Sequence, residues 1–178
     1  MNQYDYIVIG GGSAGSAVTG RLAVDGHRSV CLIEAGGRNN DFRVKTPGMM
    51  PFLSGSQNYR YETVPQKGLG GRTGFQPRGR GLGGSSAING TVWFRGIPED
   101  FDEWAEQGNT EWSYIKTLPY FRKSETDADF LGDDFHGSDG PIPVKRYKKE
   151  DMLPSVQAFW DAAKGAGFPE THDLNHPE

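Results

Sequence analysis

The stretch YDYIVIGGGSAGSAVTGRLAVDGHRSVCLIE, residues 4–34, has the pattern of a strand, a helix and a second strand. Residues 4–9 and 29–33 are short, apolar and rich in β-branched side chains, as buried strands are. Between them, the apolar and small side chains of residues 13–25 recur at helical spacing, and Gly26 is suited to end the helix. Strands joined in this way are parallel with a right-handed crossover, so the stretch predicts the βαβ unit of an α/β fold.

The turn between the first strand and the helix carries a dinucleotide-binding pattern. Gly10, Gly12 and Gly15 have the spacing G-x-G-x-x-G, which allows a tight turn, close approach of a pyrophosphate and close packing of helix and strand. Glu34 ends the second strand, 19 residues after Gly15. A carboxylate there accepts hydrogen bonds from ribose hydroxyls and repels a 2′-phosphate. The pattern predicts binding of the adenosine part of FAD or NAD and does not distinguish the two.

Composition and charge argue against several classes of protein. The chain has 178 residues, a net charge of −4 and a single cysteine. The length suffices for one compact core, and the acidic balance argues against a nucleic-acid partner. Cys31 lies within the second strand pattern, and neither a signal peptide nor an apolar run of roughly 18 residues is visible. We therefore expect a cytoplasmic protein without a transmembrane segment.

The remaining chain shows less regular patterns. Residues 36–60 are polar and contain Gly, Pro and Asn, which is typical of a long surface segment, and residues 59–64 have the pattern of a short strand. We expect four further helices, over residues 85–94, from Pro98 onward, over 113–124 with Ser113 as the cap and Pro119 bending or dividing it, and over 152–166.

A second glycine-rich segment is more specific than the first. Residues 79–90 read GRGLGGSSAING, residues 91–96 read TVWFRG, and Asp102 closes the pattern. These residues resemble the signature of the glucose–methanol–choline (GMC) oxidoreductases at each specified position. Other segments resemble the family in the expected order, namely YET at 61–63, DFDEW at 100–104, WSY at 112–114, LPYF at 118–121, HG at 136–137 and DLN at 173–175.

The resemblance implies FAD rather than NAD as the cofactor. The turn at residues 83–86 offers backbone donors and hydroxyls to the pyrophosphate and the flavin edge, and Asn89 is expected near the reactive part of the ring. Ile88 stands where some members tether FAD through a histidine, so the FAD is expected to be non-covalent. The expected cofactor-binding residues are Gly10, Gly12, Ser13, Ala14, Gly15, Glu34, Ala35, Gly83, Gly84, Ser85, Asn89, Gly90 and Val92.

The resemblance also implies an activity, the oxidation of the CH–OH group of a small alcohol with hydride transfer to flavin N5. It is closest to the bacterial alcohol and choline dehydrogenase-like branch. In this family the catalytic histidine and its partner belong to a C-terminal segment, so we assign no catalytic residue and expect residues 1–178 to be inactive without that part of the protein. A NAD-dependent dehydrogenase and a non-catalytic cofactor-binding fragment are the alternatives.

The expected architecture is an incomplete Rossmann-like FAD-binding fold with the start of a second, substrate-binding domain. We expect the N-terminal part of the FAD-binding domain over residues 1–125 and the truncated start of the substrate region over residues 126–178. The four histidines have no spacing that suggests a metal site, and we expect no bound metal.

Overall fold

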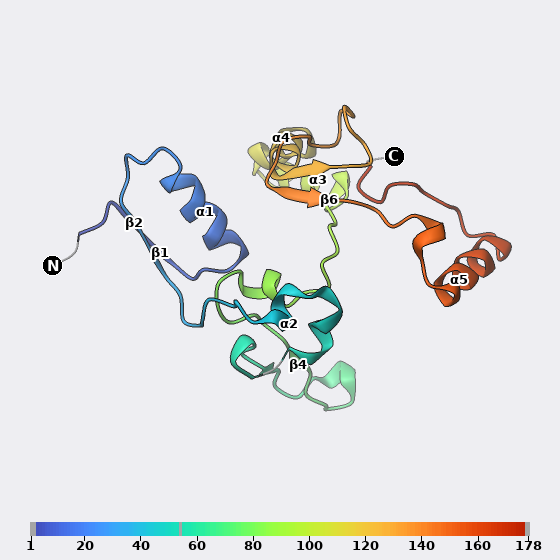
Figure 1. Ribbon diagram of the computed structural model, residues 1–178, viewed down its shortest axis with the longest axis horizontal. Helices are drawn as coiled ribbons and strands as arrows, with labels where there is room; N and C mark the ends of the chain where they lie inside the picture. Colours follow the sequence, from blue (N-terminus) through green and yellow to red (C-terminus); the bar gives the residue numbers. More distant parts are fainter. Residues whose placement is uncertain (1–2, 54, 177–178) are drawn as a thin grey trace. The chain divides into compact units, whose positions relative to one another are not determined.

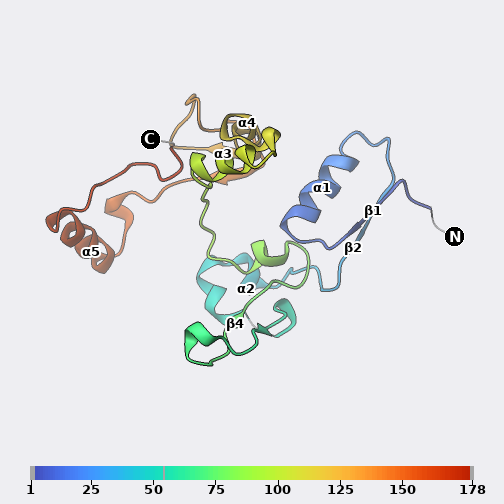
Figure 2. The ribbon, with the colours of Figure 1, turned by 180° about the vertical axis from the view of Figure 1, so that it is seen from behind.

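The computed structural model describes residues 3–53 and 55–176 (Figures 1 and 2). The chain forms two compact units, residues 1–92 and residues 93–178, which are described separately below. The expected boundary between an FAD-binding and a substrate region at residues 125 and 126 concerns function; this division into units does not test it, and it stays a prediction. Among the described residues, no helix has both the length and the apolar character needed to cross a bilayer.

The first unit opens with the predicted βαβ arrangement. Strand β1 (Tyr6–Ile9) pairs in parallel with β2 (Val30–Ile33), and helix α1 (Ser13–Ala23) contacts both strands (Figure 1). A Cβ atom at Gly15 would lie 1.9 Å from the carbonyl oxygen of Gly10, so only glycine permits this approach of helix and strand. The fold class predicted from residues 4–34 is confirmed.

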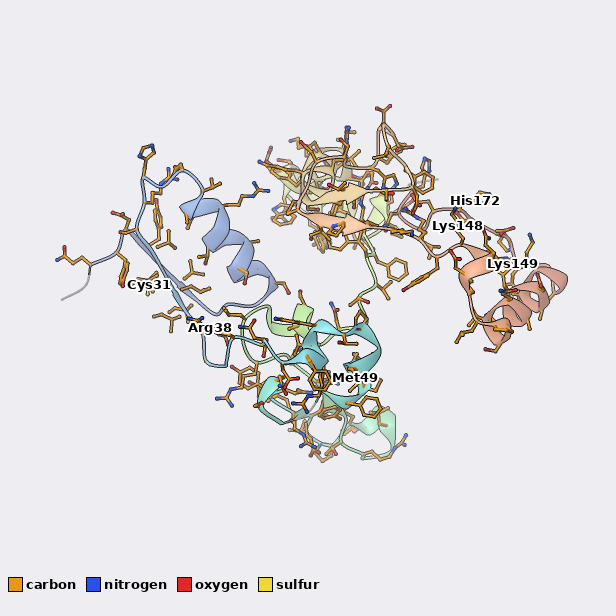
Figure 3. All side chains as sticks on the ribbon, in the orientation of Figure 1. Cys31, Arg38, Met49, Lys148, Lys149 and His172 are labelled. Atoms are coloured by element: carbon orange, nitrogen blue, oxygen red, sulfur yellow. The ribbon has the colours of Figure 1, made fainter. Side chains whose placement is uncertain are left out.

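The strands are more exposed than the sequence predicted. Ile7 is 60% exposed and Ile9 is 84% exposed. Cys31 on β2, which Figure 3 labels, is half-buried. The physical reason is that a single helix covers only one face of the two-stranded sheet. Parallel sheets are normally covered on both faces, so these exposed apolar side chains are typical of a sheet face that packs against further helices or strands.

The segment after β2 contains short helices rather than an extended surface loop. Residues 36–60, expected to lack regular structure, contain α2 (Phe42–Lys45), η1 (Pro47–Phe52) and η2 (Gly55–Gln57). The side chain of Asp41 caps α2 by accepting the Arg43 N–H at 2.8 Å. The short strand expected over 59–64 is β3 (Tyr61–Glu62), which pairs antiparallel with β4 (Phe75–Gln76) across the turn η3 (Lys67–Leu69).

The helix expected over residues 85–94 does not form. The chain makes one 3-10 turn, η4 (Gly84–Ala87), and residues 88–97 are neither helix nor strand. Two features stop the helix: Gly90 has a low helix propensity, and Thr91 has a left-handed backbone with φ of +57°.

The second unit is built around two helices and a short parallel sheet. Its elements are α3 (Pro98–Glu106), η5 (Thr110–Trp112), α4 (Tyr114–Ser124), β5 (Glu125–Asp127), β6 (Ile142–Val144), η6 (Lys149–Asp151) and α5 (Pro154–Gly165). β5 pairs in parallel with β6. The buried apolar cluster consists of Phe101, Tyr114 and Leu118, with Phe121 and Phe135 packed against it.

The predicted helices of this unit form, with two differences in detail. Pro98 occupies the first turn of α3, as predicted from its fixed φ. Ser113 is the N-cap of α4, but its side chain makes no capping hydrogen bond; Asp102 Oδ1 instead accepts the Tyr114 N–H at 3.0 Å. Pro119 lies inside α4 and does not divide it.

Candidate cofactor site

The N-terminus of α1 has the features of an anion-binding site. Gly10, with φ of +94°, turns the chain from β1 toward Gly12, the N-cap of α1. Gly12 has no side chain that could cap the helix, and the first turn carries no acidic residue. The N–H groups of Ser13, Ala14 and Gly15 therefore lie at a positive dipole end without a side-chain cap, which is the arrangement that binds phosphate.

The second glycine cluster lies against the first within the same unit. The Gly83 N–H donates to the Gly11 carbonyl oxygen at 2.8 Å, and Gly12 and Gly83 form a parallel β-bridge. A Cβ atom at Gly84 would lie 2.7 Å from the Cα atom of Gly12, so a side chain at this position would force the two segments apart. The start of α1 and the start of η4 therefore meet, and the binding of one cofactor by both clusters stays a prediction.

Glu34 connects the end of β2 to both glycine clusters. Its carboxylate accepts the N–H groups of Gly11 at 2.6 Å, Gly36 at 2.8 Å and Gly81 at 3.0 Å. The hydrogen bonds from Gly36 and then Gly11 lower the pKa of this carboxyl below its ordinary value, so it is ionised at neutral pH. A carboxylate has about four lone-pair sites, and three are occupied here. The predicted bond to a ribose stays a prediction.

Two further predicted cofactor-binding residues, Ser85 and Ala35, accept hydrogen bonds from residues just before η4. Ser85 Oγ accepts the Gly79 N–H at 3.1 Å, which stabilises the turn before η4. The Ala35 carbonyl oxygen accepts a hydrogen bond from the Arg80 guanidinium at 3.3 Å. These contacts hold the second cluster next to the end of β2, and the cofactor contacts of Ser85 and Ala35 stay predictions.

The last candidates form an exposed segment after η4. Asn89, Gly90 and Val92 are all exposed, and Asn89 Oδ1 accepts the Thr91 N–H at 3.0 Å. The segment offers backbone and amide donors outside regular secondary structure, as a binding loop does.

Comparison with known proteins identifies the family. The family model described as GMC oxidoreductase matches residues 4–178. The chain belongs to the GMC oxidoreductase family. FAD is the cofactor of this family, so the alternative of a NAD-dependent dehydrogenase is wrong.

Relatives of this GMC chain include both sequences and solved structures. It is 44% identical over 177 residues to the oxygen-dependent choline dehydrogenase of Vibrio vulnificus (strain YJ016), covering 98% of this chain and 31% of the relative. It superposes on pyridoxine 4-oxidase from Mesorbium loti with a TM-score of 0.91 at 35% identity, covering 99% of this chain and 35% of that one. It also superposes on Aspergillus oryzae RIB40 formate oxidase, in a variant solved to study its FAD modification, with a TM-score of 0.79 at 32% identity, covering 93% of this chain and 31% of that one. The chain thus spans about a third of these relatives and has the N-terminal part of their α/β fold.

Sequence reasoning missed two contributors to the site of this GMC chain. The Ser86 hydroxyl forms a hydrogen bond with the Ser13 hydroxyl, so Ser86, rather than Ser85, meets the start of α1. Gly81 donates to Glu34 across 47 positions of sequence. The adjacent hydroxyls at 85 and 86 were the available signal for Ser86, whereas nothing local marks Gly81.

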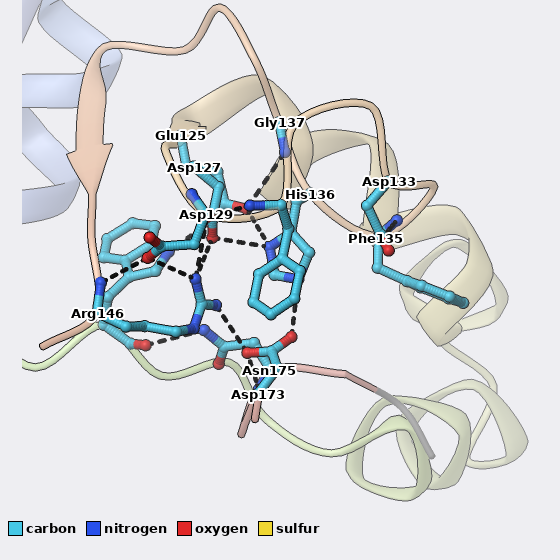
Figure 4. Close-up of polar contacts among 12 residues, drawn as sticks. Glu125, Asp127, Asp129, Asp133, Phe135, His136, Gly137, Arg146, Asp173 and Asn175 are labelled. Atoms are coloured by element: carbon cyan, nitrogen blue, oxygen red, sulfur yellow. Dashed lines mark hydrogen bonds and ion pairs between the residues drawn. The ribbon is translucent and has the colours of Figure 1, made fainter. Parts of the chain in front are cut away.

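The second unit of the GMC chain contains a buried ionic network (Figure 4). Glu125 is fully buried and accepts from Arg95 Nη2 and from the indole Nε1 of Trp93, both at 2.5 Å. Asp127 is also fully buried, and Arg146 Nη1 lies 2.8 Å from its Oδ2. Such pairs hold their surroundings in one arrangement, because removing either partner leaves an uncompensated buried charge.

His136 lies at the centre of this network. Its Nδ1 is 3.1 Å from carboxylate oxygens of both Glu125 and Asp127, and its Nε2 is 2.8 Å from Asp173 Oδ2 (Figure 4). Glu125, Asp127 and His136 are close enough to share a metal ion, with ligand atoms within 4.8 Å of one another. Each carboxylate already faces an arginine, so the protein itself supplies the cations and the cluster is accounted for as an ion-pair network.

The network also lowers the pKa of two carboxyls. Burial raises the pKa of Asp127, but hydrogen bonds from Arg146 and from the N–H groups of Asp129 and Phe130 more than offset it, so the pKa lies below its ordinary value. The pKa of Asp173 is also below its ordinary value. Burial raises this pKa, but the hydrogen bonds from the Asn175 N–H and from Arg146 outweigh that effect.

Proposed function

We propose that the complete gene product carrying residues 1–178 is an FAD-dependent oxidoreductase that oxidises the CH–OH group of an alcohol. The observation that carries this proposal is the meeting of the two glycine clusters at the start of α1, where the Gly83 N–H binds the Gly11 carbonyl oxygen at 2.8 Å. This contact places two sets of backbone donors beside one another, as a cofactor with a pyrophosphate requires. When bound, FAD supplies the hydride acceptor.

Each part of the site has a role in this proposal. The N–H groups of Ser13, Ala14 and Gly15 bind the pyrophosphate, and Glu34 uses its remaining acceptor capacity for the ribose. Asn89 donates to the flavin ring, where a fixed donor stabilises the negative charge that develops on reduction.

The substrate class follows from the relatives. The chain resembles a choline dehydrogenase at 44% identity, and choline is an alcohol, so we propose a small alcohol that is oxidised to a carbonyl compound. We assign no catalytic residue within residues 1–178 and propose that the catalytic groups, together with much of the substrate site, come from other parts of the gene product. The single free cysteine, Cys31, supports a reducing compartment such as the cytoplasm.

The absorption spectrum of the purified gene product tests the proposal. A flavin spectrum that bleaches when an alcohol is added without oxygen would support both the cofactor and the reaction. A preparation that binds no flavin under conditions in which it is folded would refute the cofactor assignment. Bound flavin that no alcohol reduces would favour the alternative of a non-catalytic cofactor-binding protein.

A further inference from the structure

Asn89 and Gly90 form the single Asn-Gly pair of the chain. In such a pair the backbone nitrogen of the glycine can reach the carboxamide carbon of the asparagine, because glycine has no Cβ atom to obstruct the approach. Both residues are exposed, and residues 88–97 are neither helix nor strand. Water therefore reaches the pair, and no regular secondary structure restrains its backbone.

The two nitrogen atoms of this pair carry no competing hydrogen bonds. Within the described part of the chain, neither the Gly90 N–H nor the Asn89 Nδ2 group donates a hydrogen bond. A bond to protein at either nitrogen would have to break before the two residues could react with one another. The Gly90 nitrogen is thus available as a nucleophile, and the Asn89 amino group is available as a leaving group.

The Asn89 carbonyl oxygen, by contrast, is bound. Asn89 Oδ1 accepts the Thr91 N–H at 3.0 Å, which closes a local turn and limits rotation of the carboxamide. When the Gly90 nitrogen attacks the Asn89 Cγ atom, negative charge develops on this same oxygen. A donor that is already in place stabilises such charge without reorganisation, as in an oxyanion hole. The turn therefore supplies a donor for the addition step.

We propose that Asn89 is a modification site, at which the Gly90 nitrogen displaces the side-chain amino group and the Thr91 N–H stabilises the oxyanion. A bond forms between Gly90 N and Asn89 Cγ as Gly90 N loses its proton to water. The Cγ–Nδ2 bond then breaks, and Nδ2 takes up a proton and leaves as ammonia. Water opens the resulting cyclic imide at either carbonyl, which gives aspartate or isoaspartate. Nothing is oxidised or reduced, and a carboxylate replaces a neutral amide. This inference is independent of the proposed function.

The chain contains a matched comparison at Asn58. Its Oδ1 accepts the Arg60 N–H at 2.9 Å, and Arg60 has φ of +56°, close to the +57° of Thr91. The residue between them is Tyr59, whose N–H donates to the Arg78 carbonyl oxygen at 2.9 Å. Asn58 thus has the bound carbonyl oxygen without a free nucleophile beside it, and we expect it to stay intact.

The test uses the complete gene product freed of flavin, since the proposed function places the flavin at Asn89, with the folded state checked by circular dichroism. The protein is incubated at mildly alkaline pH and mapped by proteolysis and mass spectrometry. We expect aspartate and isoaspartate at Asn89 before any other asparagine changes, at a rate that rises with pH because the attacking nitrogen must lose its proton. The reaction should be about fivefold faster than in a synthetic peptide of residues 84–96, a factor typical of one net hydrogen bond. A rate no faster than in the peptide would overturn the proposal.

Two variants separate the structural arrangement from the dipeptide sequence. A Cβ atom at Gly90 would lie 4.0 Å from Val92 Cγ2, an ordinary contact, so Gly90→Ala fits the fold. It should slow the reaction by at least about tenfold, because the added atom displaces the nucleophile. Tyr59→Gly creates a second Asn-Gly pair whose N–H is still bound by Arg78, and its Asn58 should remain intact. Reaction of Gly90→Ala at the wild-type rate, or of Asn58 in Tyr59→Gly as fast as Asn89, would refute the assignment.

Discussion

Replacing Glu34 by alanine should lower both stability and FAD affinity. The carboxylate accepts three backbone N–H groups, at 2.6, 2.8 and 3.0 Å, and each charge-assisted bond is worth about 1.5–3 kcal/mol. Glu34 is half-buried, so in the variant water replaces part of the hydrogen bonding that these N–H groups lose. We expect the free energy of unfolding to fall by about 2–4 kcal/mol. Loss of the ribose contact should raise the FAD dissociation constant by about 10- to 100-fold.

Two measurements separate these effects: urea unfolding of the apoprotein and FAD titration followed by flavin fluorescence. Asp5→Ala is the matched control. Asp5 accepts the Ser29 N–H and the Ser29 hydroxyl, both at 2.7 Å, just before the first residues of β1 and β2, whereas Glu34 follows the last residue of β2. That variant should lose stability but keep its FAD affinity. If Glu34→Ala loses stability but binds FAD as tightly as the wild type, the only role of Glu34 is to accept the three backbone N–H groups, and the ribose assignment is wrong.

Three further predictions concern the ionic network and the cofactor linkage. Arg95→Met should cost about 3–5 kcal/mol in urea unfolding, because the fully buried Glu125 would lose its arginine partner, whereas Lys116→Met at an exposed pair should cost less than about 1 kcal/mol; equal losses would contradict the burial argument. The folded pKa of Asp127 is depressed, so its stabilising contribution is complete above about pH 4 and is lost as the pH falls through the lowered pKa; Asp127→Asn should flatten the acid side of the stability profile. Acid denaturation should release free flavin, since Ile88 cannot form a covalent link, and flavin that precipitates with the polypeptide would show an attachment elsewhere.

Much of the first unit was predictable from local patterns. The strand, turn and helix around Gly10–Gly15 follow from apolar periodicity and glycine spacing over about 30 consecutive residues, and the parallel pairing follows from the crossover rule. The second glycine cluster identified the family and, through it, the cofactor. The same local reasoning failed for residues 85–94, where apolar side chains and glycines suggested a helix that the left-handed Thr91 excludes.

The determining contacts in the rest of the molecule join residues far apart in the sequence. The bond between Gly81 and Glu34 spans 47 positions, and that between Arg95 and Glu125 spans 30. Glu125 and Asp127 look like surface acids in the sequence, since charged residues are seldom fully buried unless they are paired. Only the folded chain brings the arginines to them. The sequence alone therefore determined the βαβ unit, the family and FAD, because their signals are carried by neighbouring residues. The tertiary structure decided which carboxylates are buried and what they bind, because a partner distant in sequence leaves no periodic or local trace.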